Sequence, residues 1–147
     1  MPQMIFVNLP VADLARSTAF YEATGFTKNP MFSDDTTANC MVLSETIFVM
    51  LLTHEKFSQF TPRTIADARQ VSEVLLCVNA ESRDGVDALV AKALAGGGQA
   101  DPCPRQDHGF MYGRSYEDPD GHIWEVMWMD MGAFQQAKSG QEQAATG

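Results

Sequence analysis

One order of predicted secondary-structure elements occurs twice in this chain, and this repetition limits the folds that it can adopt. Over residues 4–54, the apolar run 4–11 predicts a strand, and Asp13 is placed to cap a helix over residues 14–24. Gly25 ends that helix, and the runs ANCMVLS and ETIFVMLLTH predict two further strands. The first segment is therefore a strand, a helix and a set of strands.

The same order returns over residues 71–130. SEVLLCVNA predicts a strand, residues 83–95 predict an amphipathic helix, and GFMYGRSYE and GHIWEVMWM predict two strands joined by a DPDG turn. We therefore expect an α+β fold of two βαβββ modules, about residues 4–54 and 71–130, within one domain over residues 1–134. An α+β sandwich without internal symmetry is the alternative. The polar tail 135–147 is expected to be flexible.

Composition excludes several classes of function. The 147 residues carry a net charge of −9, whereas nucleic-acid binding needs a basic face, so nucleic acid is not an expected partner. No apolar run approaches the ~20 residues that span a bilayer, and the N-terminal segment lacks the features of a signal peptide. The three cysteines form no CxxC pair. We expect a cytoplasmic protein that does not bind a membrane.

The closing strand carries an isolated acid. In HIWEVMW, Glu125 shares a strand face with apolar side chains such as Met127, where an unpaired carboxylate is costly to desolvate. Glu73 occupies a similar row in the first strand of the second module. A cation between the two carboxylates, a pairing of them with Arg114, or a shared proton would each resolve that cost. The alternative is that Glu73 lies in solvent and only Glu125 is inside, paired with an arginine.

Two segments resemble the vicinal oxygen chelate superfamily, which includes glyoxalase I, extradiol dioxygenases, fosfomycin resistance enzymes and bleomycin resistance proteins. FVNLPVADLARSTAFYEATGF is similar to its opening module, and YEDPDGHIWEVMWMD is similar to its closing strands. The resemblance covers about residues 4–130. It implies paired βαβββ modules that form half-barrel sheets around a cup. In the family's enzymes a divalent metal is held there by four positions, one on the first and one on the last strand of each module.

Carried over position by position, the resemblance implies an incomplete metal site. Phe6 stands where the first strand has His or Gln, and Leu51 (or Met50, if the register shifts by one residue) stands at the last-strand position. Glu73 and Glu125 stand at the second module's positions and are the expected ligands only if a metal is bound. Glu125 is also the candidate catalytic residue. Because two of the four positions are apolar, we favour a cup without a metal over one that holds a divalent metal, and the cofactor is left undetermined.

A small molecule is the expected ligand of the cup. The residues expected to line it are Phe6, Asn8, Leu51, Tyr112, Arg114 and Trp124. Tyrosine side chains beside an arginine suit an anionic or aromatic ligand. For Tyr112 and Arg114, the alternative is a half-buried strand whose long side chains reach solvent.

Three functions remain open at this point. The apolar ligand positions favour a protein of the bleomycin resistance type, which binds a small molecule in a metal-free cup. The second is a metal-dependent lyase, similar to lactoylglutathione lyase, or a dioxygenase, in which the metal polarises vicinal oxygens and a glutamate acts as a base. The third is a dimeric scaffold without turnover. The resemblance also implies a homodimer.

Overall fold

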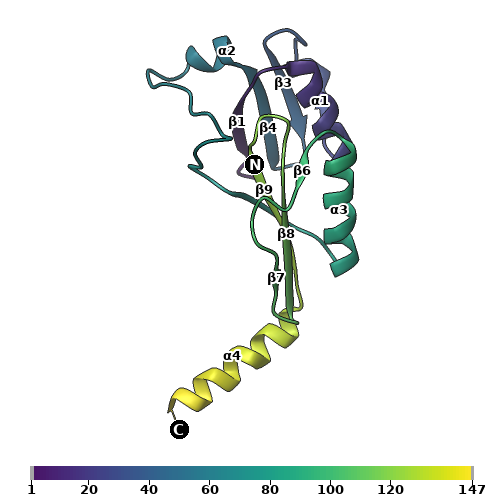
Figure 1. The fold of residues 1–147 in the computed structure, drawn as a ribbon, viewed down its shortest axis with the longest axis vertical. Coiled ribbons are helices and arrows are strands. Elements are labelled where there is room, and N and C mark those ends of the chain that lie inside the picture. Colours follow the sequence, from purple (N-terminus) through teal and green to yellow (C-terminus); the bar gives the residue numbers. More distant parts are fainter. Residues whose placement is uncertain (1, 147) are drawn as a thin grey trace.

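The computed structural model describes the backbone of residues 2–146 and the side chains of residues 2–140, and its strands form two sheets of like topology (Figure 1). The first sheet contains, in order, β1 (Ile5–Val11), β4 (Ile47–Thr53), β3 (Ala38–Val42) and β2 (Thr27–Asn29). The second contains, in order, β5 (Leu76–Asn79), β9 (Ile123–Met129), β8 (Met111–Glu117) and β6 (Gln99–Ala100), with β7 (Gln106–Asp107) also paired to β8. In each module the first strand pairs in parallel with the last. The predicted α+β fold of duplicated βαβββ modules is confirmed.

A helix follows the first strand of each module, and both helices lie on the same side of the sheets (Figure 1). These helices are α1 (Leu14–Ala23) and α3 (Arg83–Ala95). As predicted, the Asp13 side chain caps α1 by accepting a hydrogen bond of 3.0 Å from the backbone N–H of Arg16. The turn after α1 needs Gly25, because its φ of +107° lies in the left-handed region.

The opposite side of the sheets is partly covered by the spacer, residues 54–75, which joins the two modules (Figure 1). It begins with α2 (His54–Ser58), and residues 59–75 form neither helix nor strand. A short 3-10 helix, η1 (Pro30–Phe32), connects β2 to β3. The helices and the spacer therefore leave each sheet with one well-covered face and one partly open face.

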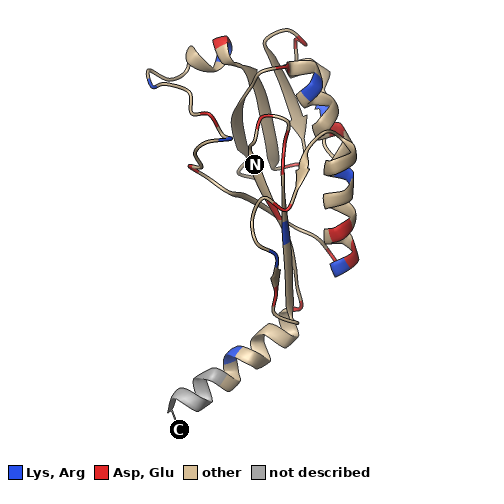
Figure 2. Ribbon diagram, in the orientation of Figure 1, with Lys and Arg blue, Asp and Glu red and all other residues tan. Residues whose placement is uncertain are grey.

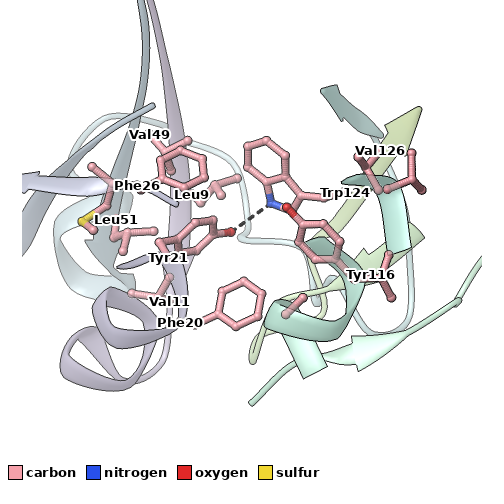
Figure 3. Close-up of a cluster of buried hydrophobic side chains, with 14 of the residues drawn as sticks. Leu9, Val11, Phe20, Tyr21, Phe26, Val49, Leu51, Tyr116, Trp124 and Val126 are labelled. Carbon is pink, nitrogen blue, oxygen red and sulfur yellow. Dashed lines mark hydrogen bonds between the residues drawn. The ribbon is translucent and has the colours of Figure 1, made fainter. Parts of the chain in front are cut away.

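The two modules share one apolar core on the helix side (Figure 3). Tyr21 of α1 is fully buried; its hydroxyl accepts a hydrogen bond from Nε1 of Trp124 (3.0 Å) and donates one to the carboxyl of Asp118 (2.7 Å). The ring of Phe26 meets Trp124 in an edge-on contact with 5.8 Å between centroids. Because Tyr21 and Phe26 belong to the first module and Trp124 to the second, this core joins the modules directly.

The DPDG turn between β8 and β9 forms a second set of contacts between the modules. Its Asp120 carboxylate accepts hydrogen bonds from the backbone N–H of Ala12 (2.8 Å) and the hydroxyl of Ser17 (3.0 Å). Its His122 ring donates through Nε2 to the carbonyl oxygen of Pro10 at 2.8 Å. The tight turn was predicted, but its contacts with β1 and α1 were not, because they join residues more than 100 positions apart.

A helix, α4 (Met131–Thr146), occupies most of the tail for which a flexible polar extension was expected. Asp130 caps it by accepting a hydrogen bond of 3.1 Å from the backbone N–H of Ala133, and Phe134 packs on Phe110 with 5.6 Å between centroids. The helix projects from the rest of the molecule (Figure 1). Its Ala- and Gln-rich sequence favours a helix even without an apolar stripe. Neither this helix nor any other within residues 2–146 is long and apolar enough to cross a membrane.

Candidate functional site

Alternation along the strands decides which expected cup residues face the open side. On β1 the buried Leu9 faces the helices, so its neighbour Asn8, like Phe6, faces the open side. Phe6 is 48% exposed and stacks on Phe48 of β4 with 4.5 Å between ring centroids. Glu125 is half-buried on the open face of β9, because Trp124 and Val126 on either side belong to the core. Phe6, Asn8 and Glu125 are therefore on the side expected for a cup.

Leu51 and Trp124 do not line an open cup, contrary to expectation. Both side chains are buried in the core on the helix side of their strands (Figure 3). Met50, which the alternative register placed at the ligand position, pairs with Asn8 on the open face of the first sheet. The one-residue shift matters because successive side chains on a strand point to opposite faces.

Tyr112 and Arg114 also lie on the helix side, where acids of the second module engage them. Arg114 donates hydrogen bonds to Asp101 through Nε (3.0 Å) and Nη2 (2.7 Å), and to Asp87 of α3 through Nη1 (2.9 Å). The Tyr112 hydroxyl donates to Asp87 at 2.7 Å. Arg114 is therefore not the partner of Glu125 that the sequence suggested.

Acid titration should weaken this cluster. Hydrogen bonds from Arg114 hold the pKa of Asp101 below its usual value, and those from Tyr112 and then Arg114 do the same for Asp87. A carboxyl with a lower pKa in the folded state stabilises the fold above its unfolded pKa, and this contribution is lost as the pH falls through the folded pKa. We expect the free energies of unfolding of wild type and Arg114→Gln, measured in urea, to converge below about pH 4. A difference that stays constant down to about pH 2 would contradict this assignment.

The residues at the family's metal positions do not fit a divalent metal. Phe6 has no donor atom, and Met50 offers only a thioether. Glu73 lies outside β5, in an exposed segment, because the strand starts at Leu76 rather than at residue 72. The β5 residue beside Glu125 is instead Cys77. Within the described part of the chain, no three His, Cys, Asp or Glu side chains form a group that could hold a metal ion.

Glu125 and Cys77 border a small cavity of about 100 Å³ on the open face of the second sheet, together with Cys103. Burial, and then the charge of Glu125, raise the pKa of the Cys77 thiol. A thiol that holds its proton is a poor nucleophile and a poor metal ligand. Neither the cavity's size nor this chemistry favours Glu125 and Cys77 as a catalytic pair.

A larger hollow of about 420 Å³, which we call the spacer pocket, lies between the two modules and under the spacer. Asn8 and Pro10 of β1 form part of its wall, and Ile123 at the start of β9 forms another part. The spacer contributes both apolar and polar residues. The apolar ones are Phe57, Ile65, Ala66, Ala68, Val71 and Val74, and the polar ones are Thr61, Arg63, Thr64, Ser72 and Glu73. Glu73 borders this pocket, so the structure brings it near Asn8 and separates it from the cavity beside Glu125.

Sequence reasoning missed the spacer as a wall of the site. Apolar residues recur there among polar ones, from Ile65 to Val74. That recurrence was the available signal, because a surface loop without a covering role has little reason to carry so many apolar side chains.

Comparisons with known proteins agree with the fold described above. Residues 3–42 match the family described as bleomycin resistance protein-like N-terminal. Hypothetical protein SA1046 from S. aureus is 25% identical with a TM-score of 0.71, over 87% of this chain and 94% of that one. A glyoxalase/bleomycin resistance protein/dioxygenase family enzyme from Burkholderia phytofirmans is 19% identical with a TM-score of 0.69, over 87% of this chain and 99% of that one. The chain therefore has the fold of proteins named glyoxalase/bleomycin resistance protein/dioxygenase, as the resemblance of its sequence implied.

Another solved structure of similar fold has a different activity in its name. The fosfomycin resistance protein FosX from Mesorhizobium loti is 13% identical with a TM-score of 0.62, over 87% of this chain and 92% of that one. No curated protein matches the chain. Because one fold hosts many functions, the shared fold does not determine the activity of this chain.

Proposed function

We propose that this protein binds a small, largely apolar molecule non-covalently in the spacer pocket, without metal-dependent turnover. The observation that carries the proposal is the pocket itself, about 420 Å³ in volume and walled by both modules and the spacer. That volume falls within the range of roughly 300–1,000 Å³ typical of small-molecule sites.

The chemistry of the wall supports an apolar ligand. Ile65, Val74 and Ile123 offer aliphatic surface that a ligand would remove from water, at roughly 25 cal/mol per Å² buried. Asn8 adds a side-chain amide on the open face of β1, which can orient a ligand through one or two hydrogen bonds. The wall also carries two charged residues, Arg63 and Glu73, but its larger part is apolar, as is usual for small-molecule sites.

The metal-dependent lyase or dioxygenase gains less support. Its chemistry requires a Lewis acid held by oxygen or nitrogen ligands, and the first module supplies Phe6 and Met50 at the relevant positions. Glu125 borders a separate and smaller cavity. For these reasons we assign Glu125 no catalytic step.

Titration with N-phenylnaphthylamine, an uncharged dye that fluoresces in apolar surroundings, tests the proposal. We expect saturable binding with one site per chain, because the dye's aromatic rings would enter the spacer pocket. Binding should be the same with EDTA present and should disappear in denaturing urea. Fluorescence that rises linearly without saturation, or that requires an added divalent metal, would contradict the proposal.

A further inference from the structure

Beside the spacer pocket lies a second, more polar hollow of about 360 Å³. The two hollows adjoin, and together we call them the groove, because five residues border both: Pro10, Ile65, Ala66, Ala68 and His122. The polar half is bordered by Arg16 at the start of α1, His54 at the start of α2 and Arg69 of the spacer. We call this half the arginine pocket.

The chain's six arginines fall into two sets with different partners. Arg83, Arg105 and Arg114 each form an ion pair with an aspartate in the second module. The other three, Arg16, Arg63 and Arg69, border the groove, and none of them forms an ion pair with a described residue. Figure 2 shows that basic and acidic positions occur on α1, on the spacer and on α3 alike.

This division is informative because acids are plentiful in the chain. There are 19 Asp and Glu residues against 10 Lys and Arg, so unpaired arginines do not result from a shortage of carboxylates. Guanidinium groups bind carboxylate, phosphate, phosphonate and sulfonate oxygens through two parallel N–H donors. Arg16, Arg63 and Arg69 are exposed and make no ion pair with a described residue, so their guanidinium groups are available to an anion supplied from outside the chain.

Two carboxylates also border the arginine pocket, but both already accept hydrogen bonds from nearby groups of the chain. Asp120 accepts one hydrogen bond at each oxygen, from Ala12 and Ser17. Asp67 accepts a hydrogen bond of 3.0 Å from the backbone N–H of Arg69 in its own turn. The side-chain donors around the pocket make fewer hydrogen bonds to described residues than these carboxylates accept. Arg69 donates through Nη2 to the Pro119 carbonyl, while the Arg16 guanidinium and the His54 ring make no hydrogen bond to a described residue.

We infer that the natural ligand is amphipathic, with an apolar body in the spacer pocket and an anionic group in the arginine pocket. This inference rests on the proposed function, since it adds a charged end to the same ligand. The anionic group would accept hydrogen bonds from Arg16 and Arg69, at the edge of the groove where solvent completes its hydration. An uncharged molecule of the same shape leaves those donors unused and binds more weakly.

A matched pair of dyes separates the two claims. Anilinonaphthalene sulfonate has the aromatic body of N-phenylnaphthylamine and carries a sulfonate in addition. We expect wild type to bind the sulfonate about tenfold more tightly than the uncharged dye, and this advantage should shrink as sodium chloride is added. Arg16→Gln should remove most of the advantage and leave the affinity for the uncharged dye unchanged.

Lys92→Gln on α3 is the matched control, because it removes one positive charge away from the groove and should affect neither dye. Arg69→Gln provides a second variant, and thermal unfolding shows whether losing its bond to Pro119 disturbs the turn. Equal affinities for the two dyes, or equal losses in Arg16→Gln and Lys92→Gln, would overturn the anionic group and leave the apolar pocket standing. Failure of both dyes to bind wild type would instead overturn the proposed function.

Discussion

Trp124→Ala is expected to lower the free energy of unfolding by about 3–5 kcal/mol, the range seen when a large buried aromatic side chain is removed from a core. Trp124 is only 3% exposed and contacts Tyr21 and Phe26 of the first module. The substitution removes these aromatic contacts and leaves a cavity where the modules meet. Unfolding in urea, followed by circular dichroism, would measure the loss.

Trp124→Phe is the control for this prediction. It keeps an aromatic ring in the core but removes the Nε1 donor to the Tyr21 hydroxyl, so we expect a loss of about 1–2 kcal/mol, part of it from the smaller ring. Trp128, four positions along β9 on the same face, is half-buried and provides a second comparison. If Trp124→Ala cost less than about 1 kcal/mol, the modules would not depend on a shared core.

The elements of the fold were predictable because their signals are local. Asp13 caps α1, Gly25 follows its end, and the apolar periodicity of residues 83–95 gives α3 at the residues expected. Caps, glycines and hydrophobic periods act over a few residues, so a single sequence contains them. The duplication of element order then restricted the topology to one of few arrangements.

The candidate site was less predictable because it depends on register and on distant partners. A strand expected to begin at residue 72 begins at Leu76, and this moved Glu73 out of the sheet. Leu51 was predicted at the ligand position, but Met50 is the residue on the open face. The error of one position matters because Leu51 lies on the opposite face of β4, in the buried core. Nothing in the sequence of β8 showed that Asp87, on α3, would engage Arg114.

Blocking the groove should have the largest effect on binding. Ala66 is an exposed spacer residue that borders both the spacer pocket and the arginine pocket. We expect an indole at this position, on the wall common to both pockets, to fill part of the spacer pocket and exclude the body of a ligand. We expect Ala66→Trp to raise the dissociation constant for N-phenylnaphthylamine by about 30-fold or more, equivalent to about 2 kcal/mol of lost apolar contact.

The matched control is Ala91→Trp, the same substitution at an exposed position on α3, outside the groove. The most direct measurement is therefore a side-by-side titration of wild type, Ala66→Trp and Ala91→Trp with the uncharged dye, after unfolding curves have shown that all three are folded. We expect tight and equal binding by wild type and Ala91→Trp, and loss of binding by Ala66→Trp. Undiminished binding by folded Ala66→Trp would contradict this expectation and place the ligand site elsewhere on the molecule.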